Sequence, residues 1–212
     1  MNGMSKLLVS ISSCQYFEKT GLNQPLRDTW LPELTKLGVD YKFFHGYGAT
    51  PKSDVVVLPV VDELYGLTEK AKAKLKWAHD SGYEYVYSCF PDTYTRPERL
   101  IACGYEGVDY IGNRYKFDDS APFCQGGPGY VLSRKACEVI FNHPQSYLND
   151  DCYIGDVLYR AGVACIHHAG FTAFGPGPLK SNQTITNHLS TQPGGYTTNS
   201  VKTEHQRWME SL

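Results

Sequence analysis

Short apolar runs alternate with longer amphipathic stretches along most of the chain. The apolar runs predict strands over residues 6–13, 39–46, 54–60, 83–90, 108–113, 129–133 and 163–168, the last of them in the core. The amphipathic stretches predict helices over residues 26–38, 67–82, 134–143 and 150–162. Strands that alternate with helices are typical of an α/β protein, in which helices flank both faces of a mainly parallel sheet.

The helix expected over residues 67–82 has the clearest pattern. Leu67, Ala71, Leu75 and Ala78 form one apolar stripe, and the lysines of this segment are expected to lie off that stripe. The tail from 171 to 200 is instead rich in Gly, Pro, Thr and Asn, which is typical of a functional lid or a linker. A short helical pattern follows over residues 201–212.

Composition narrows the class of protein. The 212 residues favour a single domain over residues 1–212, which is either a whole protein or the N-terminal part of a longer one. The net charge is -2 and there is no basic run, which argues against nucleic acid as a partner. None of the 7 cysteines forms a CxxC pair, so we expect reduced thiols in a cytoplasmic protein and no structural zinc. The apolar run near the N-terminus is too short for a signal peptide or a membrane span.

Candidate functional side chains follow several predicted strands. In a parallel sheet, ligands bind at the carboxyl ends of the strands. The residues expected at those ends are Ser12, Ser13, Asp62, Asp92, His167 and His168. Asp92 can hold a divalent cation that bridges two phosphates, or it can cap a turn or the following helix. Adjacent histidines in a strand point to opposite faces, so at most one of His167 and His168 is expected to face the site and ligate a metal.

Two further segments can carry chemistry. Gly126 and Gly127 belong to the run GGPGYVLSR, in which glycines either let the backbone approach a ligand closely or form a tight turn before a strand. Asp150 and Asp151 stand where an amphipathic helix is expected to begin. One of these acids is expected to cap the helix, and the other can be a carboxylate that takes a proton from a sugar hydroxyl.

Each signal is weak alone, but their order along residues 6–168 resembles the β-1,3-galactosyltransferase and Fringe family of GT-A glycosyltransferases. The shared elements are an R-x-T-W helix, a D-x-x-x-x-L-T-x-K stretch followed by Trp, a strand ending in an acidic triplet, a G-G-x-G-Y-V-L-S run and an acidic element before a glycine. The matching residues are Arg27, Thr29, Trp30, Asp62, Leu67, Thr68, Lys70, Trp77, Tyr85, Val86, Asp92, Tyr94, Pro97, Gly126, Gly127, Gly129, Tyr130, Asp150, Asp151 and Gly155. The whole chain also resembles the N-terminal domain of the glycosyltransferases with which chlorella viruses build capsid glycans, which implies a viral protein in the host-cell cytoplasm.

The resemblance implies a GT-A-type, Rossmann-like domain that transfers a hexose or deoxyhexose from a UDP-sugar to a hydroxyl of a glycan or glycoprotein acceptor. It implies a manganese or magnesium ion, held by Asp92 with His167 or His168, that neutralises the charge of the departing diphosphate. Asp151, with Asp150 beside it, is the implied base of an inverting reaction; in a retaining reaction Asp151 would position the acceptor or the donor. The implied contacts to the nucleotide-sugar are Ser12, Ser13, Arg27, Asp62, Lys70, Asp92, Gly126 and Gly127.

The sequence departs from the family at the acidic triplet, where Phe90 and Pro91 replace the first two acids. Asp92 alone remains, so diphosphate and water would have to complete the coordination of a metal. This departure keeps a second hypothesis open, a sugar-nucleotide or glycan-binding module without catalysis. A nucleotidyltransferase is a third alternative, and it is disfavoured because the stretch SSCQYFEKTG lacks the usual basic, Gly-rich loop.

Overall fold

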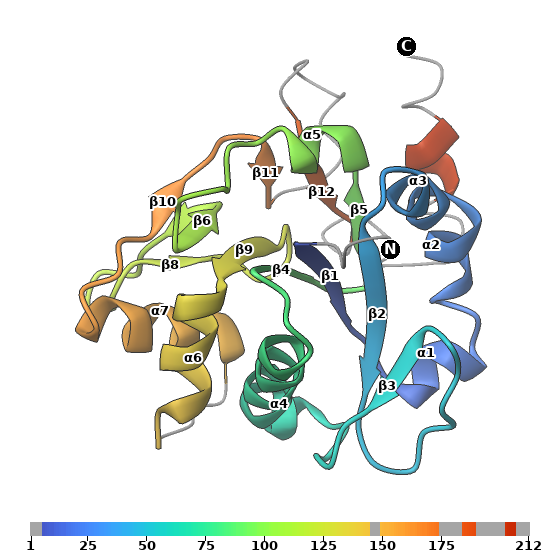
Figure 1. The fold of residues 1–212 in the computed structure, drawn as a ribbon, viewed down its shortest axis with the longest axis horizontal. Helices are drawn as coiled ribbons and strands as arrows, with labels where there is room; N and C mark the ends of the chain where they lie inside the picture. Colours follow the sequence, from blue (N-terminus) through green and yellow to red (C-terminus); the bar gives the residue numbers. More distant parts are fainter. Residues whose placement is uncertain (1–5, 145–148, 174–183, 190–201, 207–212) are drawn as a thin grey trace.

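A seven-stranded sheet forms the centre of the computed structural model, which describes residues 6–144, 149–173, 184–189 and 202–206 (Figure 1). The order of the strands is β10-β6-β9-β4-β1-β2-β3. These strands are β1 (Leu7–Ser12), β2 (Asp40–His45), β3 (Val55–Val57), β4 (Tyr85–Cys89), β6 (Tyr110–Gly112), β9 (Tyr130–Ser133) and β10 (Ile166–His167). Within this sheet only β9 runs antiparallel to its neighbours, so the predicted mainly parallel sheet is confirmed.

Helices cover both faces of the sheet, as predicted (Figure 1). One face is covered by α4 (Leu67–Asp80), α6 (Arg134–Asn142) and α7 (Asp150–Arg160). The other face is covered by α2 (Gln24–Asp28), α3 (Trp30–Lys36) and α5 (Pro97–Ile101). Side chains alternate along β1, so Leu7 and Val9 join the core under α2 and α3, whereas Leu8 joins the core under α4. Among the described residues, no helix has both the length and the apolar character needed to cross a membrane.

Two smaller sheets lie beside the central one, and the sequence did not predict them. The first has the order β11-β12-β5, and the second pairs β7 with β8. Their strands are β5 (Thr93–Thr95), β7 (Arg114–Tyr115), β8 (Phe123–Cys124), β11 (Phe171–Thr172) and β12 (Thr186–His188). Runs of two or three residues are too short to show a period, which is why the pattern of apolar residues missed them.

The tail expected to be a lid or a linker contributes β11 and β12 to the small sheet. There β12 pairs antiparallel with β5, which follows directly on the end of β4. Residues 174–183 and 190–201 of the tail lie outside the described residues. Of the helical pattern expected over 201–212, residues 202–206 are helical and the rest lies outside the described residues.

Three predictions of local structure are wrong. The helix expected over 26–38 is broken at Thr29, where φ is -122° and ψ is -96°. Pro32 has no N–H to donate to the preceding turn, so it fits the first turn of α3 but cannot continue α2. The strand expected in the core over 163–168 is only the exposed, two-residue β10 at the edge of the sheet. Lys70 and Lys74 are buried with the apolar stripe of α4, not off it.

Replacing Gly129 with alanine should reduce stability far more than replacing Gly162. Both glycines have a positive φ, 77° and 75°, so alanine carries a similar backbone strain of about 1–2 kcal/mol at either position. At Gly129 the added methyl would lie 2.6 Å from the ring of Tyr87 and 2.8 Å from the carbonyl oxygen of Ser88, whereas at Gly162 it meets nothing within 4 Å. We expect Gly129→Ala to lower the free energy of unfolding by a further ~1–3 kcal/mol in urea denaturation. Equal losses would contradict the close packing of the Gly129 backbone on β4.

Candidate active site

The carboxyl ends of neighbouring parallel strands bring several predicted residues to one edge of the sheet. β1 pairs in parallel with both β2 and β4, so their carboxyl ends lie side by side. Ser12 is the last residue of β1, Ser13 donates from its backbone N to the carbonyl oxygen of Phe44 over 3.1 Å, and Asp92 follows β4 after two residues. This edge is where an open α/β sheet binds its ligands.

Asp92 contacts His188 at this edge. The Nε2 atom of His188 lies 3.1 Å from Oδ2 of Asp92, and its Nδ1 lies 3.3 Å from the carbonyl oxygen of Ala173. Burial alone would lower the pKa of His188, but the hydrogen bond and the charge of Asp92 raise it above its ordinary value. The other carboxylate oxygen of Asp92, Oδ1, is buried and has no hydrogen-bond partner.

The predicted glycine pair, Gly126 and Gly127, lies between the Asp92–His188 contact and Asp151. A Cβ atom on Gly127 would lie 2.4 Å from Nδ1 of His188, so only glycine lets the imidazole stand here. Gly126 donates from its backbone N to Oδ2 of Asp151 over 3.0 Å. A Cβ atom on Gly126 would already touch the ring of Phe90 at 3.4 Å. The loop therefore packs closely between the end of β4 and the start of α7.

Both predicted acids lie in the first turn of α7. Oδ1 of Asp151 accepts a hydrogen bond of 2.8 Å from the backbone N of Cys152. Asp150 is buried, and burial raises the pKa of its carboxyl group to about 6, although the charge of Lys74 opposes this rise. A carboxylate in the first turn is stabilised by the partial positive charge of the helix N-terminus. Asp151 is thus the acid of the pair that is less buried and is held at the glycine loop.

Asp62 and Lys70, two of the predicted nucleotide contacts, form an ion pair beside Ser13. The Lys70 ammonium donates to Oδ1 of Asp62 and to the backbone carbonyl of Ser13. The Oδ2 atom of Asp62 accepts a weak hydrogen bond of 3.4 Å from the backbone N of Gln15. His45, which the sequence did not suggest, is buried nearby with an unpartnered Nε2, and both burial and the charge of Lys70 lower its pKa.

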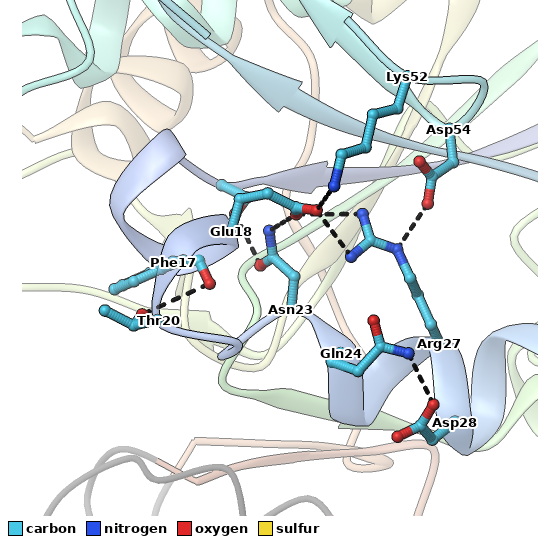
Figure 2. Close-up of polar contacts among 10 residues, drawn as sticks. Phe17, Glu18, Thr20, Asn23, Gln24, Arg27, Asp28, Lys52 and Asp54 are labelled. Carbon is cyan, nitrogen blue, oxygen red and sulfur yellow. Dashed lines mark hydrogen bonds and ion pairs between the residues drawn. The ribbon is translucent and has the colours of Figure 1, made fainter. Parts of the chain in front are cut away.

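The guanidinium of Arg27, a predicted nucleotide contact, forms ion pairs with two acidic side chains of the protein. Figure 2 shows its guanidinium between Glu18, at 3.1 Å, and Asp54, at 2.7 Å. The same guanidinium lies 4.4 Å from the centroid of the Phe43 ring. Burial would raise the pKa of Glu18, but hydrogen bonds from Asn23, Lys52 and Arg27 lower it to about 2. This network ties α1 (Gln15–Lys19) to α2 and to the start of β3.

His167 and His168 make other contacts than the predicted one with Asp92. Nδ1 of His167 accepts a hydrogen bond of 3.3 Å from the backbone N of Arg114, and Nδ1 of His168 accepts one of 3.0 Å from the backbone N of Gly170. They line a pocket at β10 with Arg99. The imidazole beside Asp92 belongs instead to His188, in the tail where the sequence showed no strand.

The donor set at Asp92 is small but fits a hard divalent cation. Across the residues that the structure describes, no group of three or more His, Cys, Asp or Glu side chains is arranged to hold a metal ion. Asp92 and His188 supply one carboxylate and one imidazole, which manganese accepts. The unpartnered, buried Oδ1 of Asp92 is an acceptor that a cation would satisfy. A metal here would take its remaining ligands from a diphosphate and water.

Comparisons with known proteins bear on the fold. No protein-family model matches the chain. The human N-acetyllactosaminide β-1,3-N-acetylglucosaminyltransferase 4 is 36% identical over 64 residues, which are 29% of this chain and 17% of that protein. The chain therefore spans well under two thirds of the length of this relative.

Two solved structures share the architecture. A glycosyltransferase involved in the glycosylation of the major capsid of PBCV-1 has a TM-score of 0.57 at 12% identity, over 94% of this chain and 98% of that chain. A protein from Desulfovibrio desulfuricans G20, described as a nucleotide-diphospho-sugar transferase, has a TM-score of 0.51 at 13% identity, over 78% of this chain and 80% of that chain. The GT-A-type, Rossmann-like fold expected from the sequence is thereby confirmed.

Replacing Arg27 with methionine should destabilise the fold. The change leaves Glu18 and Asp54 without their shared cation, and we expect the free energy of unfolding at pH 7 to fall by about 2 kcal/mol, between the losses for an exposed and a fully buried pair. Because the pKa of Glu18 is lowered from 4.5 to about 2, its stabilising contribution is complete above about pH 4.5 and is lost as the pH falls toward 2. The deficit of the variant should shrink over that range.

Urea unfolding at several pH values measures this deficit, with Arg160→Met as the control. Arg160 also pairs with an acid, Asp156, but its side chain is 64% exposed, so its loss should cost less than about 1 kcal/mol. If Arg27→Met is as stable as the wild type but binds the nucleotide more weakly, Arg27 is a nucleotide contact and not a structural residue.

Proposed function

We propose that this chain is a glycosyltransferase that uses a nucleotide-sugar, specifically a metal-assisted transferase of a hexose or deoxyhexose from a UDP-sugar. One observation carries the proposal: Asp92, His188, Gly127, Gly126 and Asp151 form a continuous series of contacts. A candidate pair of metal ligands and a candidate base therefore contact neighbouring residues of one glycine loop. That arrangement suits the transfer of a sugar from a diphosphate to a hydroxyl group.

Asp92 and His188 are the residues that would hold Mn²⁺ or Mg²⁺. The ion, when bound, would act as a Lewis acid toward the diphosphate of the leaving group. The protein's own part is to keep the imidazole in place, through the contact of His188 with Ala173 and the absence of a side chain at Gly127. His188 thus replaces His167 and His168 in the proposed ligand set.

The donor would extend along the edge from Asp62 to the glycine loop. Beside Asp62, a pocket of about 340 Å³ is lined by Tyr47, Pro59, Val60, Val61, Tyr65, Gly66 and Glu69. Its flat rings suit a nucleoside, while Asp62 and the Lys70 that pairs with it would contact ribose or base. Gly126 and Gly127 stay in the proposed set as backbone contacts to the sugar, since the space where a Cβ atom of Gly127 would lie is taken by His188. Ser12 and Ser13 stay in the proposed nucleotide-sugar set through their position between these two regions, although both hydroxyls already have partners in the protein.

Asp151 is the proposed base of an inverting transfer. The acceptor hydroxyl oxygen bonds to the anomeric carbon, the bond from that carbon to the diphosphate oxygen breaks, and the hydroxyl proton passes to the Asp151 carboxylate. The Gly126 N–H holds Oδ2 of Asp151 in place for this step. Asp150 would support Asp151 from the same helical turn. We propose a glycan or glycoprotein as the acceptor, and capsid glycans, the setting of the PBCV-1 neighbour, are the first to try.

A binding module without catalysis is the second candidate, because Phe90 and Pro91 leave Asp92 as the one acid of the expected triplet. Turnover separates the two functions. An active transferase releases UDP from at least one UDP-sugar when Mn²⁺ and an acceptor are present, whereas a module binds the nucleotide-sugar and leaves it intact.

Replacing Asp92 with asparagine, or His188 with glutamine, should remove a proposed metal ligand. We expect Mn²⁺-dependent UDP release to fall at least about 100-fold in each variant, because even a change behind a ligand can lower activity that far. Electron paramagnetic resonance of Mn²⁺ in the presence of UDP gives a second, independent measurement of metal binding. His79→Gln, which alters an imidazole on α4 that contacts Asp80, is the matched control. Loss in His168→Gln with none in His188→Gln would restore the ligand set expected from the sequence.

Replacing Asp151 with asparagine should lower kcat while UDP binding is unchanged. General-base catalysis contributes roughly 10²–10⁴-fold, so we expect a decrease of that size in kcat. Asp156→Asn is the control, since Asp156 lies on the same helix and pairs with Arg160. An Asp151→Asn variant that keeps its kcat would exclude Asp151 as the base.

A further inference from the structure

A second cavity opens beside β10, and none of the roles proposed above uses it. Its volume is about 550 Å³, which is within the range of pockets that hold small organic molecules. β10 runs parallel to β6, and β6 and β4 both run antiparallel to β9, so the cavity lies at the same edge of the sheet as Asp92. The described residues that line it are Arg99, Ala102, Cys103, His167, His168, Ala169, Gly170 and Ile185. None of them belongs to the series of contacts from Asp92 to Asp151.

The hydrogen bonds of the two histidines determine which ring nitrogen can donate. Nδ1 of His167 accepts from the backbone N of Arg114 over 3.3 Å, and Nδ1 of His168 accepts from the backbone N of Gly170 over 3.0 Å. A ring nitrogen that accepts a hydrogen bond carries no proton, so the proton of each ring lies on Nε2. Neither Nε2 atom has a hydrogen-bond partner among the residues that the structure describes. Both rings are therefore donors at Nε2, and in this tautomer they offer no lone pair there to a metal ion.

Arg99 of α5 adds a positive charge to these two donors. Its Nη1 atom donates to the carbonyl oxygen of Thr184 over 2.9 Å, which fixes the guanidinium at the wall of the cavity. No acid is found among the described lining residues, and burial raises the pKa of Cys103 to about 11, so its thiol is neutral at pH 7. The neighbouring Glu98 is exposed and does not line the cavity. The described lining thus combines N–H donors and one positive charge with no negative charge.

Backbone hydrogen bonds hold the walls of the cavity in place. The backbone N of His168 donates to the carbonyl oxygen of Gly112 over 2.8 Å, and that of Ile185 donates to the carbonyl oxygen of Gly170 over 2.7 Å. The ring of His168 also packs edge-on against Phe171, with 5.7 Å between the ring centroids. Donors that are already in position lose little conformational freedom when a ligand binds.

We propose that this cavity binds an anionic sugar, whose carboxylate or phosphate group accepts hydrogen bonds from Arg99, His167 and His168. A guanidinium with further N–H donors is the combination that recognises such oxyanions. The cavity has room for a sugar ring beside the anionic group, and Ala102 and Ile185 give that ring an apolar surface. The inference goes beyond the proposed function and does not rest on it, because a transferase and a binding module can each bind such a sugar.

The test titrates the ¹⁵N-histidine-labelled chain with glucuronate, glucose 6-phosphate, glucose and inorganic phosphate, and follows the imidazole signals by NMR. His167→Gln and His168→Phe assign the two rings. We expect at least one of the anionic sugars to shift the signals of both His167 and His168 and to leave those of His188 unchanged. Glucose should cause no shift, and inorganic phosphate should bind more weakly than the anionic sugar. The comparison of glucuronate with glucose 6-phosphate identifies the anionic group.

Replacing Arg99 with glutamine should weaken the binding of the anionic sugar about 10–100-fold, because a hydrogen bond to a charged group is lost. Arg160→Gln is the matched control, since Arg160 is exposed on α7 and pairs with Asp156. His167→Gln should weaken binding about 2–10-fold, the effect of one neutral donor. His167 is exposed, so this variant tests the cavity even if Arg99→Gln does not fold.

The inference is overturned if neither anionic sugar shifts the two rings at tens of millimolar, or if glucose or inorganic phosphate binds as tightly as the anionic sugar. The ¹⁵N shifts of the ligand-free chain give a further check, because a proton on Nδ1 of either ring would remove the proposed donors. Unchanged affinity in both Arg99→Gln and His167→Gln would place the ligand elsewhere. These titrations need no transfer reaction, so a chain that transfers no sugar would refute the proposed transferase and leave the result for this cavity readable.

Discussion

The pairing between β5 and β12 determines where the imidazole of the candidate site stands. His188 is opposite Thr93, the residue after Asp92, and the backbone N of Leu189 donates to the carbonyl oxygen of Asp92 over 2.8 Å. Successive side chains of a strand point to opposite faces, so a shift of one residue would turn His188 away from Asp92. The contact also depends on Gly127, because a side chain there would occupy the space of the ring. The register of the three residue pairs between β5 and β12 thus determines that His188 contacts Asp92 at the end of β4.

Buried charges in this half of the molecule are compensated within the protein, and this leaves few groups open to a ligand. Lys70 is used by Asp62 and Ser13, Lys74 by two serines, and Arg27 by two acids. Burying a charge is tolerable only with such partners. Asp92 differs from these residues, because its carboxylate oxygen Oδ1 is buried and has no hydrogen-bond partner. An unsatisfied acceptor at the carboxyl edge of a parallel sheet is where a bound cation or a ligand donor would be expected.

The sequence predicted the central sheet, and several of the candidate residues that it named lie together at one edge of that sheet. It failed where an element was short or where contacting residues are far apart in the chain. Long apolar runs predict β1, β2 and β4, and the sequence indicates the glycine pair and Asp151 separately, which the fold brings into contact. The sequence gives no signal at His188, because β12 has three residues within a polar tail and so shows no period. Arg27 matched a family motif, yet its partners Glu18 and Asp54 lie on other segments, and only the folded chain brings them together. The pattern of α4 did not predict that Lys74 is buried. The hydroxyl groups that accept hydrogen bonds from its ammonium lie on β1 and β4, far from α4 in the sequence.

In this chain Phe90 occupies the position at which the resembled family has the first acid of its triplet, so an aromatic ring replaces a carboxylate there. Its ring lies at the glycine loop, close enough to touch a Cβ atom at Gly126, where a carboxylate would have added negative charge beside Asp92. In the proposed transferase, the smaller negative charge at this edge would leave the protein alone with a weak attraction for a divalent cation, and the diphosphate of the donor would supply most of the charge and the ligands. Metal and nucleotide-sugar would then bind as one unit rather than in sequence. Reciprocal coupling of this kind follows from linkage, since whatever raises the affinity for one ligand raises the affinity for the other by the same factor.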